Sequence, residues 1–192
     1  MTLPNSITIA RICLIPLFAF FAWQYGMSSA NGRPDEAVRL LAASVFILTA
    51  AMDGVDGFIA RRFNQRSRLG AMLDPFADKA TILTAISVPV FSHWTDHFPI
   101  WFPIAVIGRD FVLVVGFLSL SIFFGHVDVR PSRLGKAATL FQIASIFCLL
   151  LGLRGIALIY LAALATFLTV VSGCGYVVDG VRQVRILTRA RS

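Results

Sequence analysis

Long apolar stretches alternate along the chain with short connections that contain glycine, proline or clustered charges. The three longest apolar stretches are 12–25, 98–124 and 155–178, and they contain too few polar positions to coat a water-soluble fold. We predict about six membrane-spanning helices of roughly 20 residues each, over 6–25, 37–60, 74–92, 98–124, 136–153 and 155–178. The predicted fold is all-α: a polytopic membrane protein in which residues 1–192 form a single domain.

Composition and charge support this class and exclude others. The 192 residues are 57% hydrophobic and only 14% charged, whereas about a quarter of a soluble domain is charged. An ordinary soluble enzyme and a disordered protein are therefore excluded. In a six-span arrangement, every basic residue except Arg33, Arg39, Arg109 and Arg154 falls on one side. Both termini are thus predicted to be cytoplasmic. The net charge of +7 reflects this topology and attraction to anionic membrane lipid, so we expect no nucleic-acid partner.

Four carboxylates at one predicted membrane boundary are the main candidates for chemistry. Asp53 and Asp56 are three residues apart, and Asp74 and Asp78 are four apart, so each pair projects from one face of a helix. Ionised groups at such a boundary are costly unless they are paired or bind a metal. Four converging carboxylates need cations between them. Oxygen ligands favour Mg²⁺ or Mn²⁺, and two such ions suit a phosphoryl-transfer site.

Small residues and a cation accompany these carboxylates. Gly57, Ala60 and Gly70 leave space beside them for a diphosphate or a neighbouring backbone. Close packing of membrane helices is an alternative explanation for any one of these small residues. Arg61 is placed to meet phosphate oxygens with its planar guanidinium group.

These residues together resemble the signature of the CDP-alcohol phosphotransferases. The signature positions are Asp53-Gly-Val-Asp56-Gly57-Phe-Ile-Ala60-Arg61, followed by Gly70, Asp74 and Asp78. The segment Pro4–Arg11 is similar to the opening helix of the phosphatidylglycerophosphate synthase and cardiolipin synthase branch of that family. The resemblance covers most of the chain and implies the CDP-alcohol phosphotransferase fold.

The resemblance implies an integral membrane enzyme, usually a homodimer, in the bacterial inner membrane. Such an enzyme transfers the phosphatidyl group of CDP-diacylglycerol to an alcohol and releases CMP. Gly57, Arg61 and Ser67 match positions that contact the nucleotide diphosphate in relatives. The active site is expected at the cytoplasmic boundary, where acyl chains stay in lipid while the cytidine and the acceptor come from water.

The resemblance also implies a role for each carboxylate. Asp53, Asp56 and Asp74 correspond to ligands of one Mg²⁺ or Mn²⁺ ion, and Asp53, Asp74 and Asp78 to ligands of a second. Asp78 corresponds to the general base that takes the proton of the acceptor hydroxyl. A base is needed because an alcohol is a poor nucleophile at neutral pH.

Three cations are candidates for binding the acceptor. Arg109 lies mid-span beside Asp110, and Arg133 and Lys136 enter the fifth predicted helix. Neutralisation of Arg109 by Asp110 and ordinary positive-inside anchoring are the structural alternatives. A basic pocket favours a phosphate-bearing, glycerol-based acceptor, with glycerol 3-phosphate first. Phosphatidylglycerol, the acceptor of cardiolipin synthases, is the alternative, because bacterial phosphatidylglycerophosphate synthases usually have Glu where Asp110 stands.

Two further classes compete with a phosphatidyltransferase. A cation-binding transporter would use the aspartates as ion ligands, but it leaves Arg61 and the glycine spacing unexplained. A membrane diphosphatase would use water as the acceptor. Turnover of CDP-diacylglycerol and the identity of its product separate these hypotheses.

Overall fold

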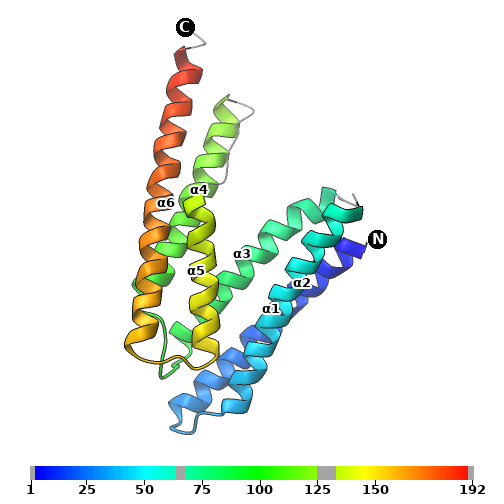
Figure 1. The fold of residues 1–192 in the computed structure, drawn as a ribbon, viewed down its shortest axis with the longest axis vertical. Coiled ribbons are helices and arrows are strands. Elements are labelled where there is room, and N and C mark those ends of the chain that lie inside the picture. Colours follow the sequence, from blue (N-terminus) through cyan, green and yellow to red (C-terminus); the bar gives the residue numbers. More distant parts are fainter. Residues whose placement is uncertain (1–2, 64–67, 125–132, 190–192) are drawn as a thin grey trace. The chain divides into compact units, whose positions relative to one another are not determined.

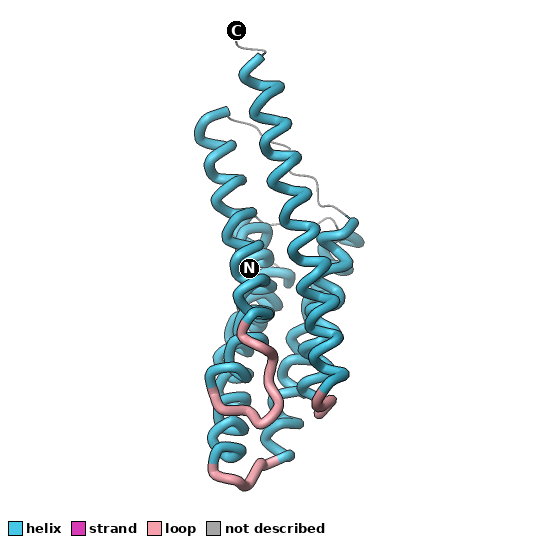
Figure 2. Tube along the Cα trace, turned by 90° about the vertical axis from the view of Figure 1, so that its left-hand side faces the viewer, coloured by secondary structure: helices cyan, strands magenta, loops and turns pink. Residues whose placement is uncertain are grey.

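Every element of secondary structure that the computed structural model describes is a helix. It describes residues 3–63, 68–124 and 133–189, with side chains described over 8–54, 73–116 except 75, 118–119 and 134–182. The helices are α1 (Leu3–Ala30), α2 (Glu36–Phe63), α3 (Arg68–Phe91), α4 (Trp101–Phe124), α5 (Arg133–Leu150) and α6 (Ile156–Arg189) (Figure 1). Figure 2 shows in pink the described connections, which are 31–35, 92–100 and 151–155. The prediction of an all-α fold with six helices is confirmed.

The first and last helices extend beyond the predicted spans. Helix α1 continues from residue 25 to Ala30, and α6 continues from residue 178 to Arg189. Hydropathy marks the apolar part of a helix, whereas a helix itself continues until a residue stops it. Helix α1 is stopped by Gly32, which has φ 72°. The N–H of the next residue, Arg33, donates a hydrogen bond back to Ser28 O in the last turn of α1 over 3.1 Å. This arrangement is a Schellman motif.

Three helices in the described part of the chain are long and apolar enough to cross a membrane. They contain the spans Thr8–Ala30, Glu36–Gly54 and Ile156–Arg182, and α5 has a shorter apolar segment, Leu134–Leu150. Large apolar side chains on these and other helices are exposed, among them Phe20, Phe111 and Phe167. Apolar side chains so abundant on the outside suit contact with lipid. The chain is therefore a membrane protein.

The chain divides into two compact units. Unit 1 comprises Met1–Phe98 and Ile146–Gly155, and unit 2 comprises Pro99–Ser145 and Ile156–Ser192. In unit 1, α1 packs against both α2 and α3. Ala22 on α1 and Ala42 and Ala43 on α2 are buried, and small side chains of this kind allow helix backbones to approach closely. Helix α1 is therefore the element that holds α2 and α3 together.

Helices α4 and α6 form the principal contact of unit 2. Val106 on α4 and Leu158, Ala162 and Ala165 on α6 are buried. A buried polar contact joins α5 to α6, since Gln142 Nε2 on α5 donates to Thr169 Oγ1 on α6 over 2.7 Å. Side-chain hydrogen bonds of this kind fix the register of neighbouring membrane helices.

Candidate active site

Two helices of unit 1 supply the predicted carboxylates. Helix α2 carries Asp53 and Asp56, and α3 carries Asp74 and Asp78. The Asp53 side chain is 51% exposed, whereas Asp74 and Asp78 are half-buried. Among the described residues, nothing lies within 4 Å of a Cβ added at the neighbouring Gly54.

Helix α1 contacts one carboxylate from each of these two helices. Thr8 Oγ1 donates a hydrogen bond to Asp74 Oδ1 over 2.7 Å. One turn further along α1, Arg11 Nη1 pairs with Asp53 Oδ1 over 2.5 Å. Thr8 and Arg11 are both buried, with Arg11 only 2% exposed. Two carboxylates that are far apart in sequence are thus fixed against the same face of one helix.

The contacts of α1 leave part of each carboxylate available. Arg11 and Thr8 each use one oxygen, Oδ1, of Asp53 and Asp74. Within the described part of the chain, neither carboxylate has another hydrogen bond or ion pair. Carboxylate oxygens are the ligands that Mg²⁺ and Mn²⁺ prefer. The chemistry of these carboxylates fits a divalent cation, although the described side chains, Asp53, Asp74 and Asp78 among them, form no group of three that could hold a metal ion.

Several predicted site residues lie wholly or partly outside the described residues. Asp56, Gly57 and Arg61 belong to α2, but their side chains are not among those described. The same holds for Arg133 at the start of α5, and Ser67 lies outside the described residues altogether. Their roles remain predictions from the sequence.

The acceptor candidate Arg109 lies in unit 2. Its Nη1 pairs with Asp110 Oδ1 over 2.9 Å, and the Arg109 side chain is only 9% exposed. The guanidinium carbon lies 5.9 Å from the centre of the Tyr176 ring, within range of a cation–π interaction. Gly173 on α6 lies beside the Arg109 stem, since a Cβ there would be in contact with Arg109 Cγ at 3.4 Å. The ion pair expected from the sequence is present, and Arg109 also packs α4 against α6.

The other described acceptor candidate, Lys136, has a different environment. It lies in the first turn of α5 and is exposed. Its neighbour Gly135 is buried. An exposed cation at the start of a helix is accessible to an anionic ligand, and the helix dipole adds to its positive field.

A second group of charged residues in unit 1 lies at the opposite end of the α1–α2 pair. Arg39 Nη2 pairs with Glu36 Oε2 over 2.7 Å. Arg154 pairs with Glu36 through Nη2 over 3.0 Å and with Asp96 through Nε over 3.5 Å. We call Glu36, Arg39, Asp96 and Arg154 the Arg39 cluster. It contains two positive and two negative side chains, so its formal charges cancel.

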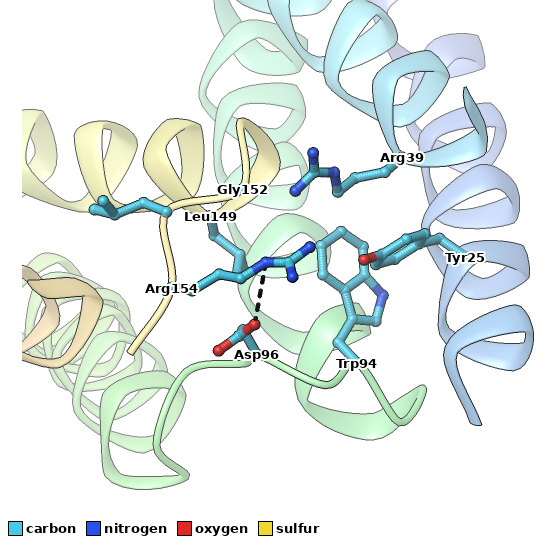
Figure 3. Close-up of a pocket in the computed structure, with 8 residues that line it drawn as sticks. Tyr25, Arg39, Trp94, Asp96, Leu149, Gly152 and Arg154 are labelled. Atoms are coloured by element: carbon cyan, nitrogen blue, oxygen red, sulfur yellow. Dashed lines mark ion pairs between the residues drawn. The ribbon is translucent and has the colours of Figure 1, made fainter. Parts of the chain in front are cut away.

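Three residues of the Arg39 cluster, Arg39, Asp96 and Arg154, line a small pocket together with Tyr25, Trp94 and Gly152 (Figure 3). The Tyr25 and Trp94 rings meet edge to face at 4.5 Å between centroids, and Trp94 Nε1 donates to Ala22 O over 2.9 Å. Gly152 has φ 88°, and a Cβ at that position would collide with the Arg39 guanidinium group. The residues that line the pocket thus come from the end of α1, the start of α2 and the connections that follow α3 and α5.

Comparison with known proteins decides the family. The sequence model of the CDP-alcohol phosphatidyltransferases matches residues 1–171 of this chain. The chain belongs to the CDP-alcohol phosphatidyltransferase family. It is therefore a transferase enzyme, as the signature over 53–78 predicted. Enzymes of this family generally depend on a divalent metal.

Named relatives within the CDP-alcohol phosphatidyltransferase family extend over nearly the whole chain. The CDP-diacylglycerol–glycerol-3-phosphate 3-phosphatidyltransferase of Bacillus subtilis is 34% identical, covering 91% of this chain and 92% of the relative. The protein of the same name from Rickettsia felis is 35% identical with the same coverage. A CMP-forming cardiolipin synthase of Streptomyces coelicolor is 34% identical, covering 79% of this chain and 65% of the relative.

The roles of Thr8 and Arg11 in this phosphatidyltransferase were not predicted from the residues. Spacing along the sequence identified the carboxylates, but the partners of Asp74 and Asp53 lie 66 and 42 residues away. One signal was present: an arginine in the otherwise apolar first helix needs a partner. The resemblance of Pro4–Arg11 to the opening helix of relatives drew attention to this segment without indicating what it contacts.

Proposed function

We propose that this chain transfers the phosphatidyl group of CDP-diacylglycerol to glycerol 3-phosphate and releases CMP. The observation that carries the proposal is the similarity of the chain, over 91% of its length, to two enzymes named for that reaction. The carboxylates of α2 and α3 add chemical support, because a diphosphate substrate requires compensation of its negative charge. The family assignment also favours a transferase over a cation-binding transporter.

Divalent cations are part of this proposal. Asp53, Asp56 and Asp74 would hold one Mg²⁺ or Mn²⁺ ion, and Asp53, Asp74 and Asp78 a second. The Oδ1 contacts of Thr8 and Arg11 support this assignment, since they orient two of these carboxylates and leave Oδ2 of each for another ligand. When bound, such ions neutralise the diphosphate and stabilise the charge of the departing CMP.

The chain's own residues carry the proton and orient the nucleotide. Asp78 accepts the proton of the acceptor hydroxyl as its oxygen attacks the lipid-side phosphorus. A new phosphorus–oxygen bond forms while the bond to CMP breaks, and CMP leaves with the electron pair. Gly57, Arg61 and Ser67 contact the diphosphate, with Arg61 offering a planar set of donors. A direct in-line displacement inverts configuration at phosphorus, and retention in a chiral-phosphorus experiment would contradict it.

The acceptor phosphate is assigned to the cations Arg109, Arg133 and Lys136. Lys136 is supported by its exposure in the first turn of α5. Arg109 has competing interactions, since it pairs with Asp110 and lies near Tyr176. A phosphate at Arg109 therefore has to share a guanidinium group that already has a carboxylate partner.

Phosphatidylglycerol is the second candidate acceptor, and the reaction would then produce cardiolipin. The observation that favours it is the 34% identity to the CMP-forming cardiolipin synthase of Streptomyces coelicolor over 79% of this chain. Aspartate at position 110 supports the same alternative. Both reactions use the same nucleotide-lipid donor and differ only in the alcohol that attacks.

Location and assembly complete the proposal. Residues 1–192 serve as a single catalytic domain in a bacterial inner membrane, with both termini and the active site on the cytoplasmic side. The distribution of arginine and lysine supports this orientation. The enzyme acts on lipid substrates as a homodimer, as is usual for the family it belongs to.

An acceptor panel tests the proposed reaction. Purified protein receives labelled CDP-diacylglycerol, Mn²⁺ and, in separate reactions, glycerol 3-phosphate, phosphatidylglycerol or no alcohol. Thin-layer chromatography identifies the lipid product. We expect phosphatidylglycerophosphate with glycerol 3-phosphate. Cardiolipin with phosphatidylglycerol would establish the second candidate, phosphatidate would indicate a diphosphatase, and failure to release CMP under all conditions would favour a cation-binding protein.

A further inference from the structure

Helix α1 contributes two polar side chains to the carboxylate site, although the metal-ligand assignments involve only α2 and α3. Thr8 and Arg11 are three residues apart, so they share one face of α1. Thr8 reaches Asp74 on α3 and Arg11 reaches Asp53 on α2. The face of α1 that carries them thus contacts one carboxylate from each of the other two helices.

Burial distinguishes these contacts from ordinary surface pairs. The Arg11 side chain is 2% exposed, and its Nε has no hydrogen-bond partner in the described part of the chain. A buried guanidinium group in a membrane helix is costly, and apolar packing would join the helices at lower cost. The pairing with an exposed carboxylate indicates that Arg11 acts on Asp53.

The buried threonines of unit 1, Thr49 and Thr8, donate hydrogen bonds to different kinds of acceptor. Thr49 lies on α2, and its hydroxyl donates to Val45 O in its own helix over 2.8 Å. That is the usual way for a membrane helix to satisfy a threonine. The Thr8 hydroxyl donates to a carboxylate on another helix. Its hydroxyl therefore acts on the orientation of Asp74.

We infer that Thr8 and Arg11 are positioning residues that fix the Asp74 and Asp53 carboxylates for binding a divalent cation. Each contact holds Oδ1 and leaves Oδ2 for the ion. Partners that orient ligand side chains in this way commonly change metal affinity by about 10–100-fold when they are removed. The inference rests on the proposed metal-dependent function, and it adds α1 to the metal site.

Thr8 gives the cleaner test, because its substitution changes no charge. We compare Thr8→Val with Thr8→Ser, which keeps the hydroxyl, and with Thr49→Val as the matched buried control. Mn²⁺ binding to purified protein is measured by electron paramagnetic resonance without substrate. We expect about tenfold weaker binding in Thr8→Val, partial or full recovery in Thr8→Ser, and wild-type binding in Thr49→Val. Wild-type affinity in folded Thr8→Val would overturn the role of Thr8.

Arg11 requires a test that separates positioning from charge. Its positive charge alone opposes a nearby cation, so simple removal of charge predicts tighter Mn²⁺ binding in Arg11→Met. Positioning predicts about tenfold weaker binding, because Asp53 loses its anchor. Arg39→Met is the matched control, since Arg39 is also a largely buried arginine paired with a carboxylate, and this variant should bind Mn²⁺ as the wild type does.

The outcomes distinguish this inference from the proposed function. If Arg11→Met does not fold, Arg11→Lys replaces it, with weaker Mn²⁺ binding again expected because lysine lacks the planar guanidinium group. Unchanged or tighter Mn²⁺ binding in the Arg11 variant overturns its positioning role. Mn²⁺ binding that is lost in Asp74→Ala but unchanged in Thr8→Val and Arg11→Met leaves the proposed function intact and removes α1 from the site. A wild-type protein that binds no Mn²⁺ and releases no CMP overturns both.

Discussion

The two ends of the α1–α2 pair both contain a largely buried arginine paired with a carboxylate, but they differ in what surrounds the pair. At one end Arg11 is 2% exposed while its partner Asp53 is 51% exposed. At the other end Arg39 is 13% exposed, and its partner Glu36 also pairs with Arg154. The carboxylate of the first pair remains accessible to a ligand. The carboxylate of the second is shared between two cations.

This difference separates the proposed metal site at Asp53 from the Arg39 cluster, whose ion pairs stabilise the fold. In the Arg39 cluster, two arginines and two carboxylates balance one another and connect segments up to 118 residues apart. The Asp53 end instead gathers carboxylates from two helices and supplies one arginine from α1. The two ends are about 21 Å apart along α2, from Arg39 to Asp53. Substitutions at the Asp53 end should therefore change activity, and substitutions in the Arg39 cluster should change stability.

The largest expected effect is at the carboxylates. Asp74→Ala and Asp78→Ala should each abolish CMP release, because the first removes a proposed metal ligand and the second also removes the proposed base. Both variants should still insert into the membrane, since neither carboxylate lies in the apolar core of unit 1. Membrane fractionation followed by a CMP-release assay measures both properties. Wild-type turnover in Asp78→Ala would exclude it from the mechanism.

The next largest effect is expected at Arg61. Arg61→Ala should weaken binding of the donor nucleotide by about 2–3 kcal/mol, the scale of a lost charge-assisted contact. The KM for CDP-diacylglycerol should rise accordingly, and the KM for the acceptor should change less. Equal changes in both KM values would indicate that Arg61 does not contact the donor specifically.

At the opposite end, Arg39→Met tests whether the Arg39 cluster is only structural. It should lower the free energy of unfolding by about 1–2 kcal/mol, since Glu36 is half exposed and keeps Arg154 as a partner. CMP release at a permissive temperature should remain at the wild-type level. Thermal unfolding in detergent and the CMP assay provide the two measurements. A large loss of activity in folded protein would remove the proposed distinction between the two ends.

The smallest effect is expected at Lys136, which belongs to unit 2. Lys136→Ala should raise the KM of the acceptor several-fold, because an exposed cation contributes about 1 kcal/mol to a phosphate contact. The KM for CDP-diacylglycerol should change less. Steady-state kinetics with each substrate varied in turn measures both values, and equal increases would place the acceptor elsewhere.

The fold was predictable from the sequence to the level of helix number and class. Apolar length and breaker residues identified six helices, because a segment in lipid must satisfy its backbone hydrogen bonds internally. The ends of α1 and α6 were not predicted, since polar residues such as Ser28 and Ser29 continue a helix without being apolar. Membrane hydropathy reports where a helix is apolar, and local capping decides where it stops.

The site was predictable only in part, for a similar reason. Helical spacing identified the carboxylates because it is a local property of the sequence. The contacts of Thr8 and Arg11 depend on how α1 packs against α2 and α3, and no local pattern encodes that packing. The Arg39 cluster was missed for the same reason, because its residues come from three separate segments of the chain: the start of α2, the connection after α3 and the connection after α5.

The central claim is that carboxylates of α2 and α3 bind divalent cations and thereby drive transfer of a phosphatidyl group. Its most direct test is to follow CMP and lipid product in one sample of purified protein, CDP-diacylglycerol and glycerol 3-phosphate, first with Mn²⁺ and then after chelation. We predict equimolar CMP and phosphatidylglycerophosphate with Mn²⁺, and neither product after chelation. Product formation that continues unchanged after chelation would contradict the account.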